Sequence, residues 1–536
     1  MIGTKINLNP FPGLRPFKAD EDYLFFGREG QTDDLLRRLS RHRFLAVVGT
    51  SGSGKSSLVR AGLLPSLYSG YMTKAGSSWR VALLRPESDP IGNLARAINQ
   101  PDVLGSKAED AASRGRIITE TTLRRGALGL VEVVQQAKMP SDENLLIVVD
   151  QFEELFRFKQ SNLRENSGDE AAAFVKLLLE ATRQEQIPVY VVLIIRSEYL
   201  GECAQFWDLT EALNDSQYLI PRLTRDQYQA AIAGPVAVGG AKITPRLVNR
   251  LLNDVADNPD QLPILQHALM RTWDYWMDNY KDGEPIDLHH YEAIGSMAKA
   301  LSKHADEIYH NLPSARSQKI AENLFKTLTD KDRYNRGTRR PTKLEEVCAV
   351  AAASAEEVSA VVEQFCGPSR SFLMPSIGVE LEPNSVLDIS HESLIRFWER
   401  LKDWVDEEAQ SARIYRRLAE SSELHQEGKA RLLDEPELTI AVNWREDNKP
   451  NQAWAQRYAS NFEQAMQFLA ASTVAHDAEI AQKERHQQEE IRRQQEEIQR
   501  QKRARRKLKF ALIAAIACLF VAICLGLVAF AGRGQC

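Results

Sequence analysis

The sequence predicts an α/β domain with a parallel sheet, followed by mainly helical domains, a charged helix and one membrane-spanning segment. Three observations predict this order. The first 230 residues alternate short apolar runs with longer helical patterns, which is typical of a parallel sheet covered by helices. A glycine-rich loop directly follows the first apolar run, at residues 49–56. Residues 510–532 carry no charged side chain and are long enough to cross a bilayer as a helix.

Composition and charge narrow the possible functions. The chain has 536 residues, 43% of them hydrophobic, and a net charge of -5, so several buried cores are possible. Residues 481–509 carry eleven basic and five acidic side chains, which leaves the preceding body acidic. An acidic body does not neutralise phosphates, so we expect no nucleic-acid partner. We interpret one basic loop as a solvated face: Lys331, Arg333, Arg336, Arg339 and Arg340.

The cysteines and the N-terminus indicate the compartment. The six cysteines lie far apart and form no C-x-x-C pair, so neither a zinc site nor a disulfide framework is expected. The first residues contain no apolar run of signal-peptide length, so we expect the body to stay on the side of the membrane where it is made.

Residues 510–532 are predicted to be a transmembrane helix. A buried core helix is the alternative, but such helices rarely reach this length without a break. The basic residues on the N-terminal side are Arg503, Arg505, Arg506, Lys507 and Lys509, whereas only Arg533 follows. The positive-inside rule therefore predicts a single-pass protein of the cell inner membrane with a cytoplasmic body.

Residues 474–509 are predicted to form a charged helical stalk, because they contain no Gly or Pro and are rich in good helix formers. Ile491 and Ile498 are seven residues apart, but Ile480 does not continue this heptad. A coiled coil therefore remains an open alternative to a solvated helix.

Apolar runs mark the strands of the predicted sheet. They lie at residues 44–48, 81–84, 145–149, 189–195 and, with a weaker signal, 218–220. From about residue 225 to residue 480 the patterns are mostly helical, with few strands and no repeat of fixed period.

The loop after the first strand matches the phosphate-binding pattern G-x-x-x-x-G-K-[ST], and a helical pattern follows it. Glycines let the backbone N–H groups point at phosphate oxygens, and the helix N-terminus adds positive charge. Lys55 is predicted to reach the β- and γ-phosphates, and Ser56 to ligate Mg²⁺. The predicted nucleotide-binding residues here are Gly49, Thr50, Ser51, Gly52, Ser53, Gly54, Lys55, Ser56 and Ser57.

Acidic residues follow the third apolar run. Asp150 ends the run at the position where such proteins hold Mg²⁺ through water. Glu153 is our first candidate for the general base that activates the attacking water, and Glu154 is the second. The alternative is that both simply begin an exposed helix, where acids are favoured.

Arg196 ends the next strand and is predicted to detect the γ-phosphate through charge-assisted hydrogen bonds. The alternative is a surface ion pair with Glu198. The order of the strands matches the additional-strand division of P-loop ATPases, and the sequence has no N-K-x-D guanine signature. We therefore expect ATP and ADP, with Mg²⁺, as the ligands.

The motifs together resemble the novel STAND NTPase family. The similar segments are NPFPGLRPF at 9–17, FFGRE at 25–29, residues 43–49 with the phosphate loop, VRAGLLP at 59–65, DQFEELF at 150–156, LPILQHAL at 262–269 and ISHESLI at 389–395. The resemblance implies a switch that is closed around ADP and opens and self-associates when ATP replaces it. It implies a P-loop ATPase domain (9–225), a helical domain (226–290) and a winged-helix domain (291–405), before a helical segment at 406–473.

The resemblance also implies roles for individual residues. Phe26, Gly27 and Arg28 would lie near the adenine, Pro263 would pack on the nucleotide, and His391 would touch the ADP β-phosphate. From the residues alone, Pro263 is a proline at a helix start, and His391 is a helix cap or a core histidine.

We therefore predict a membrane-anchored, slowly hydrolysing ATPase switch in bacterial signal transduction or defence. It would form a homo-oligomer when activated and act with an unknown protein effector or sensor, since no effector domain or propeller is evident. The alternative is a constitutive motor or assembly ATPase that acts on a protein at the membrane. A scaffold with a degenerate site is disfavoured, because Lys55, Ser56, Asp150 and Glu153 are all present.

Overall fold

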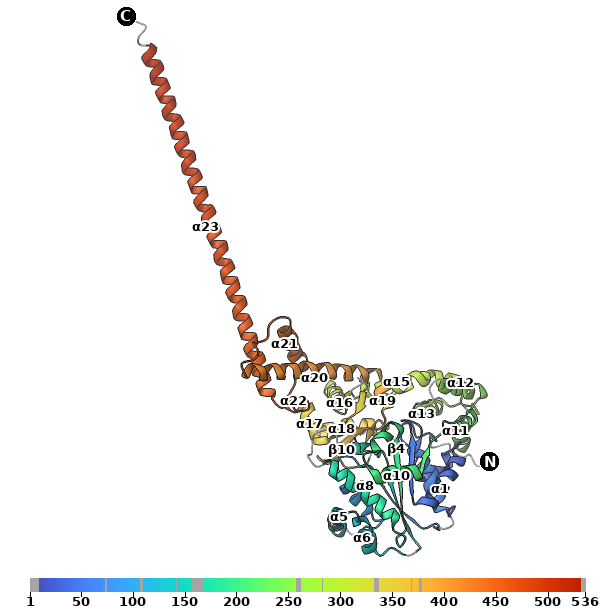
Figure 1. Ribbon diagram of the computed structural model, residues 1–536. Helices are drawn as coiled ribbons and strands as arrows, with labels where there is room; N and C mark the ends of the chain where they lie inside the picture. The colour runs from blue at the N-terminus through green and yellow to red at the C-terminus, as the bar shows by residue number, and fades with distance from the viewer. Residues whose placement is uncertain are drawn as a thin grey trace. The chain divides into compact units, whose positions relative to one another are not determined.

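The computed structural model describes residues 9–72, 75–106, 109–140, 142–156, 167–256, 262–281, 283–331, 337–367, 369–375 and 378–531 (Figure 1). Arg333, Arg336 and residue 532 of the expected membrane helix lie outside this part. The chain divides into two units, Met1–Asp406 and Glu407–Cys536. We describe each unit by itself.

The first unit contains the expected parallel sheet. Its strands are β1 (Phe44–Gly49), β2 (Trp79–Leu84), β3 (Asn144–Val149), β4 (Val189–Arg196) and β5 (Gln217–Leu219). The order is β2-β3-β4-β1-β5, and every pairing is parallel. The prediction of an α/β fold of the additional-strand type is confirmed, because β4 lies between the phosphate-loop strand and the acidic strand. The carboxyl ends of β1, β3 and β4 therefore meet at one edge.

Helices cover both faces of this sheet, and the strand residues alternate between two cores. Ala46 and Val48 pack with α4 (Pro90–Ile98), α6 (Gly129–Ala137), α8 (Ser167–Arg183) and α10 (Trp207–Asp215). Leu45 and Val47 pack with α1 (Glu29–His42), η2 (Leu58–Leu63) and α3 (Leu64–Tyr68). Burial on both faces explains why these strands are continuous apolar runs. Further short elements are η1 (Ala19–Leu24), α2 (Lys55–Ser57), α5 (Glu109–Leu123), η3 (Ser197–Tyr199) and α9 (Leu200–Cys203).

A helical region follows the sheet. It comprises α11 (Arg225–Val238), α12 (Pro245–Ala256), α13 (Leu262–Asp278), α14 (Leu288–Ala293) and α15 (Ser296–His310). Thr224 begins α11 with a capping box, since its hydroxyl accepts from the Gln227 N–H while the Gln227 side chain accepts from the Thr224 N–H.

The remainder of the first unit, which we call the third region, mixes helices with short strands. After α16 (Ala315–Thr327) come β6 (Thr329–Lys331), β7 (Gly337–Arg339), β8 (Thr342–Lys343), α17 (Leu344–Ala351), α18 (Ala355–Cys366), β9 (Leu373–Met374), β10 (Val386–Ile389) and α19 (Ser393–Phe397). Strands β8, β10 and β9 form an antiparallel sheet in that order.

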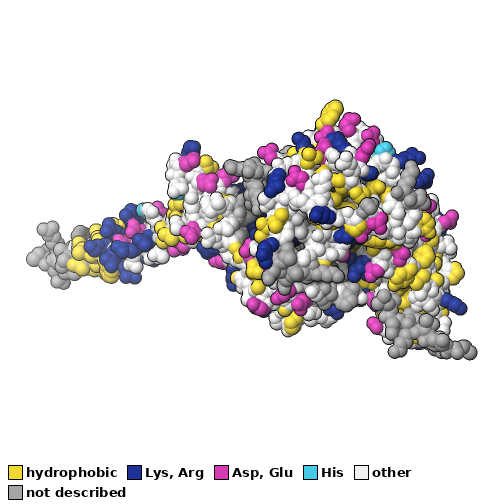
Figure 2. Space-filling view, turned by 90° about the horizontal axis from the view of Figure 1, so that it is seen from below, with side chains coloured by type: hydrophobic (Ala, Val, Ile, Leu, Met, Phe, Trp, Pro, Cys, Tyr) yellow, Lys and Arg dark blue, Asp and Glu magenta, His cyan; other side chains and the backbone are white. Residues whose placement is uncertain are grey.

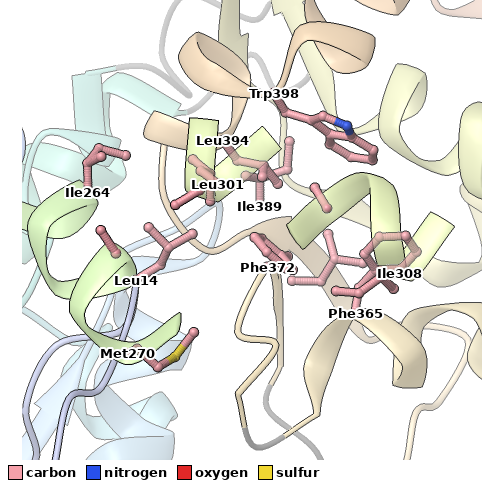
Figure 3. Close-up of a cluster of buried hydrophobic side chains, with 14 of the residues drawn as sticks. Leu14, Ile264, Met270, Leu301, Ile308, Phe365, Phe372, Ile389, Leu394 and Trp398 are labelled. Carbon is pink, nitrogen blue, oxygen red and sulfur yellow. The ribbon is translucent and has the colours of Figure 1, made fainter. Parts of the chain in front are cut away.

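One apolar core joins the helical region to the third region. Figure 3 shows Leu14, from the N-terminal segment, beside Ile264 and Met270 of α13. The same core continues through Leu301 to Trp398, both fully or almost fully buried. These regions therefore stabilise one another by shared burial rather than folding around separate cores.

The second unit is helical. Helix α20 (Glu399–Gln426) runs into it and is followed by α21 (Glu437–Asn448), α22 (Gln452–Gln456) and α23 (Phe462–Ala531). Its core contains a buried carboxylate, Glu408, which accepts from the Trp454 indole (2.8 Å), the Tyr458 hydroxyl (2.6 Å) and Arg457 (3.0 Å). Three donors offset the cost of burying this charge.

Helix α23 carries both the predicted stalk and the predicted membrane span without interruption. It is the one helix of the described residues that is long and apolar enough to cross a membrane, with a mean hydropathy of 2.3 in its best window. Figure 2 shows its Lys and Arg side chains gathered next to the apolar band. Ile480, Ile491 and Ile498 are half exposed and share one helix face, because 11 and 7 residues are close to whole turns.

Trp398→Ala is expected to lower the free energy of unfolding by about 3–5 kcal/mol, because it opens a cavity in the shared core. The indole lies 5.0 Å from the Phe325 ring and 5.4 Å from the Trp404 ring, between centroids. Trp207→Ala is the control, since Trp207 is 77% exposed, and we expect a change within about 0.5 kcal/mol. Urea unfolding followed by circular dichroism measures both; equal changes would contradict the assignment of the core.

Candidate nucleotide-binding site

A pocket lies at the carboxyl edge of the parallel sheet, and residues distant in sequence line it. The phosphate loop, the acidic strand end and Arg196 contribute from the sheet. The other lining residues include Pro12, Gly13, Leu14, Arg15, Pro16, Phe17, Arg85, Leu262, Pro263, Gln266, Arg339, Ser390, His391 and Glu392. The sheet, the helical region and the third region therefore all contribute residues to the wall of this pocket.

The phosphate loop has the curled backbone that its glycines predict. Gly52 and Gly54 have φ angles of 80° and 86°, a left-handed conformation that glycine adopts without a steric cost. The Lys55 ammonium donates to the carbonyl oxygens of Gly49 (2.9 Å) and Thr50 (2.7 Å). Burial lowers the pKa of Lys55 to about 8. Ser51, Gly52, Gly54, Lys55, Ser56 and Ser57 line the pocket, whereas Gly49, Thr50 and Ser53 support the loop.

The two predicted metal residues lie together. The Ser56 hydroxyl donates to Asp150 Oδ1 at 2.8 Å, and the carboxylate is almost completely buried. A serine hydroxyl beside a carboxylate is an oxygen donor set that suits Mg²⁺. The other carboxylate oxygen, Oδ2, accepts from Arg60 Nη2 at 3.0 Å. Sequence reasoning missed Arg60, although its position four residues after Ser56 places it on the same helix face.

The structure separates the two candidate general bases. Glu153 lines the pocket, and its Oε1 lies 3.0 Å from Arg196 Nε, while its buried Oε2 has no hydrogen-bond partner among the residues that the structure describes. Glu154 does not line the pocket and instead accepts from the Glu87 N–H at 3.3 Å. Burial raises the pKa of Glu154 to about 7, although Arg85 and Arg339 act in the opposite direction. The geometry favours Glu153 as the group that faces a substrate.

Arg196 joins the sheet to the third region. Besides Glu153, its guanidinium pairs with Glu392 at 2.9 Å. The alternative partner expected from the sequence, Glu198, forms neither of its two ion pairs among the described residues. Burial alone would raise the pKa of Glu392, but Arg196 and Arg339 lower it to about 2. Glu392 is therefore ionised at neutral pH.

The interpretation of the basic loop as a solvated face is wrong for Arg339, which is 3% exposed. Its guanidinium donates to Asp388 Oδ2 (2.6 Å), to the Ile389 carbonyl (3.1 Å) and to Gln151 Oε1 (3.0 Å). Two other loop cations are also paired, Lys331 with Asp406 and Arg340 with Glu346. No local pattern indicates these contacts, because the bond to Gln151 spans 188 residues.

His391 lies in the pocket wall and caps a helix at the same time. Its Nδ1 accepts from the Ser393 N–H at 3.1 Å, at the start of α19. Burial lowers the pKa of His391 to about 3, so the ring is neutral. Because Nδ1 accepts, the ring proton lies on Nε2, which leaves a donor suited to an anionic oxygen.

The start of α13 approaches the phosphate loop. Pro263 lines the pocket as the second residue of this helix, where its missing N–H costs nothing. The Leu262 Cδ1 atom lies 3.6 Å from where a Cβ on Gly54 would stand. The N-terminal segment also reaches the loop, since the Phe17 N–H donates to the Ser57 hydroxyl at 3.3 Å.

Phe26, Gly27 and Arg28 do not line this pocket. Phe26 packs closely against Gly234 of α11, where a Cβ would lie 2.6 Å from the ring. The buried Arg28 guanidinium donates to the carbonyls of Ser53 and Pro221, both at 2.9 Å. The three residues thus connect the phosphate loop to the helical region, and their contact with an adenine stays a prediction.

The chain is similar to several solved structures and matches the model of one protein family. No curated protein matches it. Among solved structures, it is similar to the Aeropyrum pernix ORC1 protein in complex with DNA (14% identity, 73% of this chain and 94% of that chain, TM-score 0.37). It is also similar to the ADPNP-ADP complexes of the Aeropyrum pernix ORC2 protein (10% identity, 72% and 94%, TM-score 0.40).

The RuvB Holliday junction branch migration motor of Thermotoga maritima is a further similar structure (12% identity, 72% and 97%, TM-score 0.30). Likeness at these TM-scores carries no conclusion about this chain. The model of the family Novel STAND NTPase 1, in contrast, matches residues 10–431, which is most of the chain. This protein, with its phosphate loop and acidic strand end at one pocket, therefore belongs to the novel STAND NTPases and is an enzyme of the nucleoside-triphosphate-hydrolysing class.

Proposed function

We propose that the protein is a membrane-anchored ATPase switch in bacterial signal transduction or defence, closed with ADP and self-associating with ATP. One observation carries this proposal. Arg196, at the end of β4, pairs with both Glu153 of the sheet domain and Glu392 of the third region, beside the phosphate loop. A ligand that enters this pocket therefore meets the group that holds the third region in place.

The domains follow from this arrangement. We assign the ATPase domain to residues 9–225, the helical domain to 226–290 and a winged-helix domain to 291–405. The third region supports the last assignment. After helix α16 and the β6-β7 hairpin, its order is strand β8, helices α17 and α18, and strands β9 and β10, and β8, β10 and β9 form one three-stranded sheet. Residues 406–473 are a helical segment, 474–509 the stalk and 510–532 the membrane helix.

Four charged residues of the pocket have a role in hydrolysis: Lys55, Asp150, Glu153 and Arg196. Lys55 binds the β- and γ-phosphates. Ser56 and Asp150 would hold Mg²⁺, which would supply charge neutralisation there. Glu153 accepts a proton from the attacking water. In the present arrangement the Glu153 carboxylate is paired with Arg196, so the closed form turns over slowly. When the third region leaves, Arg196 is released from Glu392 and contacts the γ-phosphate.

Population shift then explains the switch. His391 and Pro263 contact ADP only in the closed form, which therefore has the higher affinity for ADP. The additional-strand order and the absence of a guanine motif favour ATP over GTP. A protein effector or sensor would act on the open form.

We propose no nucleic-acid partner. In winged-helix proteins the third helix enters the major groove. The corresponding helix here, α18, carries Glu356, Glu357 and Glu363 on its exposed side and has no Lys or Arg. Such a helix repels phosphates.

The membrane assignment rests on α23, where seven of residues 500–509 are Lys or Arg and directly precede the apolar segment. We propose an inner-membrane location with the body in the cytoplasm. The full-length protein should stay in the membrane fraction after carbonate washing.

Glu392→Gln is expected to shift the full-length protein in detergent toward oligomers even with ADP, because it breaks the pair that closes the site. We expect ATP turnover to rise at least about threefold. Light scattering after incubation with ADP or a non-hydrolysable ATP analogue measures the mass. Glu363→Gln, on the exposed side of α18, is the control. A single mass in all states with fast, steady hydrolysis would support a constitutive motor instead.

Glu153→Gln is expected to reduce phosphate release at least about 100-fold while ATP still binds, because the general base is lost. Glu154→Gln is expected to reduce it less than about threefold, because this carboxyl lies outside the pocket wall. Phosphate release and equilibrium nucleotide binding separate the two effects. If Glu154→Gln is the more severe change, the assignment of the base is wrong.

Raising the pH above 8 is expected to weaken ADP binding. Lys55 has its pKa near 8, so above this pH the side chain is mostly a neutral amine. ADP binding must then be accompanied by protonation of this amine, which lowers the affinity for ADP by up to about tenfold per pH unit. Titrations at pH 7, 8 and 9 measure the trend. Lys55→Arg stays charged throughout and should remove the dependence between pH 7 and pH 9.

A further inference from the structure

Arg60 and Ser56 hold the two oxygens of one buried carboxylate. Ser56 donates to Asp150 Oδ1 at 2.8 Å and Arg60 to Oδ2 at 3.0 Å. Asp150 is 1% exposed, so water does not compensate its charge, and a buried carboxylate requires a counter-charge.

The local helix fixes Arg60 in this position. Residues Leu58–Leu63 form a π-helix, in which the Leu64 N–H donates to the Val59 carbonyl five residues earlier. Pro65 has no N–H to continue an α-helical pattern here, and single π turns often occur at functional sites. Gly62 lets the turn pack against α1, because a Cβ there would lie 2.6 Å from the Thr32 hydroxyl.

The Arg60 guanidinium is bound to Asp150. Among the described residues its recorded hydrogen bond goes to Asp150 alone, and its buried Nε has no acceptor. The contact with Asp150 therefore explains why a cation occupies this position.

We propose that Arg60 is a built-in counter-cation for Asp150, which lets the protein keep ADP without Mg²⁺. This inference rests on the proposed function, because it presupposes ADP in the pocket. Mg²⁺ and Arg60 neutralise the same carboxylate. Without either cation, the Asp150 charge faces the phosphate loop and repels the diphosphate.

The test compares ADP affinity with excess EDTA and with millimolar Mg²⁺, by isothermal titration of the full-length protein in detergent. For the wild type we expect the two dissociation constants to agree within about threefold. Arg60→Met should weaken binding in EDTA at least about tenfold and much less in Mg²⁺. Arg60→Lys keeps the cation and should resemble the wild type.

A double variant separates electrostatics from damage to the fold. In Arg60→Met combined with Asp150→Asn the carboxylate charge is absent, so binding in EDTA should recover to within about threefold of the wild type. If Arg60→Met shows the wild-type ratio of affinities, or if the double variant does not recover, the inference is overturned. If even the wild type binds no ADP in either buffer, the proposed function fails as well.

Discussion

The arrangement of the first unit depends on Arg196, which lies between two buried carboxylates. Parallel strands bring their carboxyl ends to one edge, so Glu153 and Arg196 meet there, and the third region adds Glu392. Removing the guanidinium would leave Glu153 without its ion pair and Glu392 with the longer contact to Arg396 at 3.7 Å. Losing the partner of a buried charge costs more than the pair itself is worth. Arg339 likewise neutralises one buried carboxylate, Asp388, and also donates to the neutral Gln151 side chain.

Two kinds of contact therefore hold the first unit together. The helical region and the third region share an apolar core, whereas the third region meets the sheet domain through charges and hydrogen bonds around the pocket. Apolar burial is non-directional and changes little with ligand. Charged contacts respond to a bound anion, because a phosphate competes for the same guanidinium groups. In the proposed switch, sensitivity to nucleotide is therefore concentrated on the side of the third region that faces the sheet domain.

The sequence predicts the parts of the site that lie within one strand and the loop after it. It does not predict the contacts between segments that are distant in the chain. The five strands follow from their apolar runs. Lys55 and Ser56 follow from the phosphate-loop pattern after the first strand, and Asp150 follows from its position at the end of the third. Arg339 was assigned to the surface, because its buried partners come from distant segments. Strands β6 to β10 have two to four residues each, which is too short for a periodic signal. Arg60 needed only its spacing from Ser56, but nothing in the sequence says that an arginine there points inward.

Helix α23 has a mechanical consequence. Ala465 and Leu469, near its start, are fully buried in the core of the second unit, and the same helix continues into the apolar segment. Residues 462–525 contain no Gly or Pro, and a helix of 70 residues is about 105 Å long. Without a kink, such a rod has no joint at which rotation or tilt of one end is lost. If the helices packed around its first turns reorient, a helix of this length would turn a small tilt into a large lateral displacement of its other end.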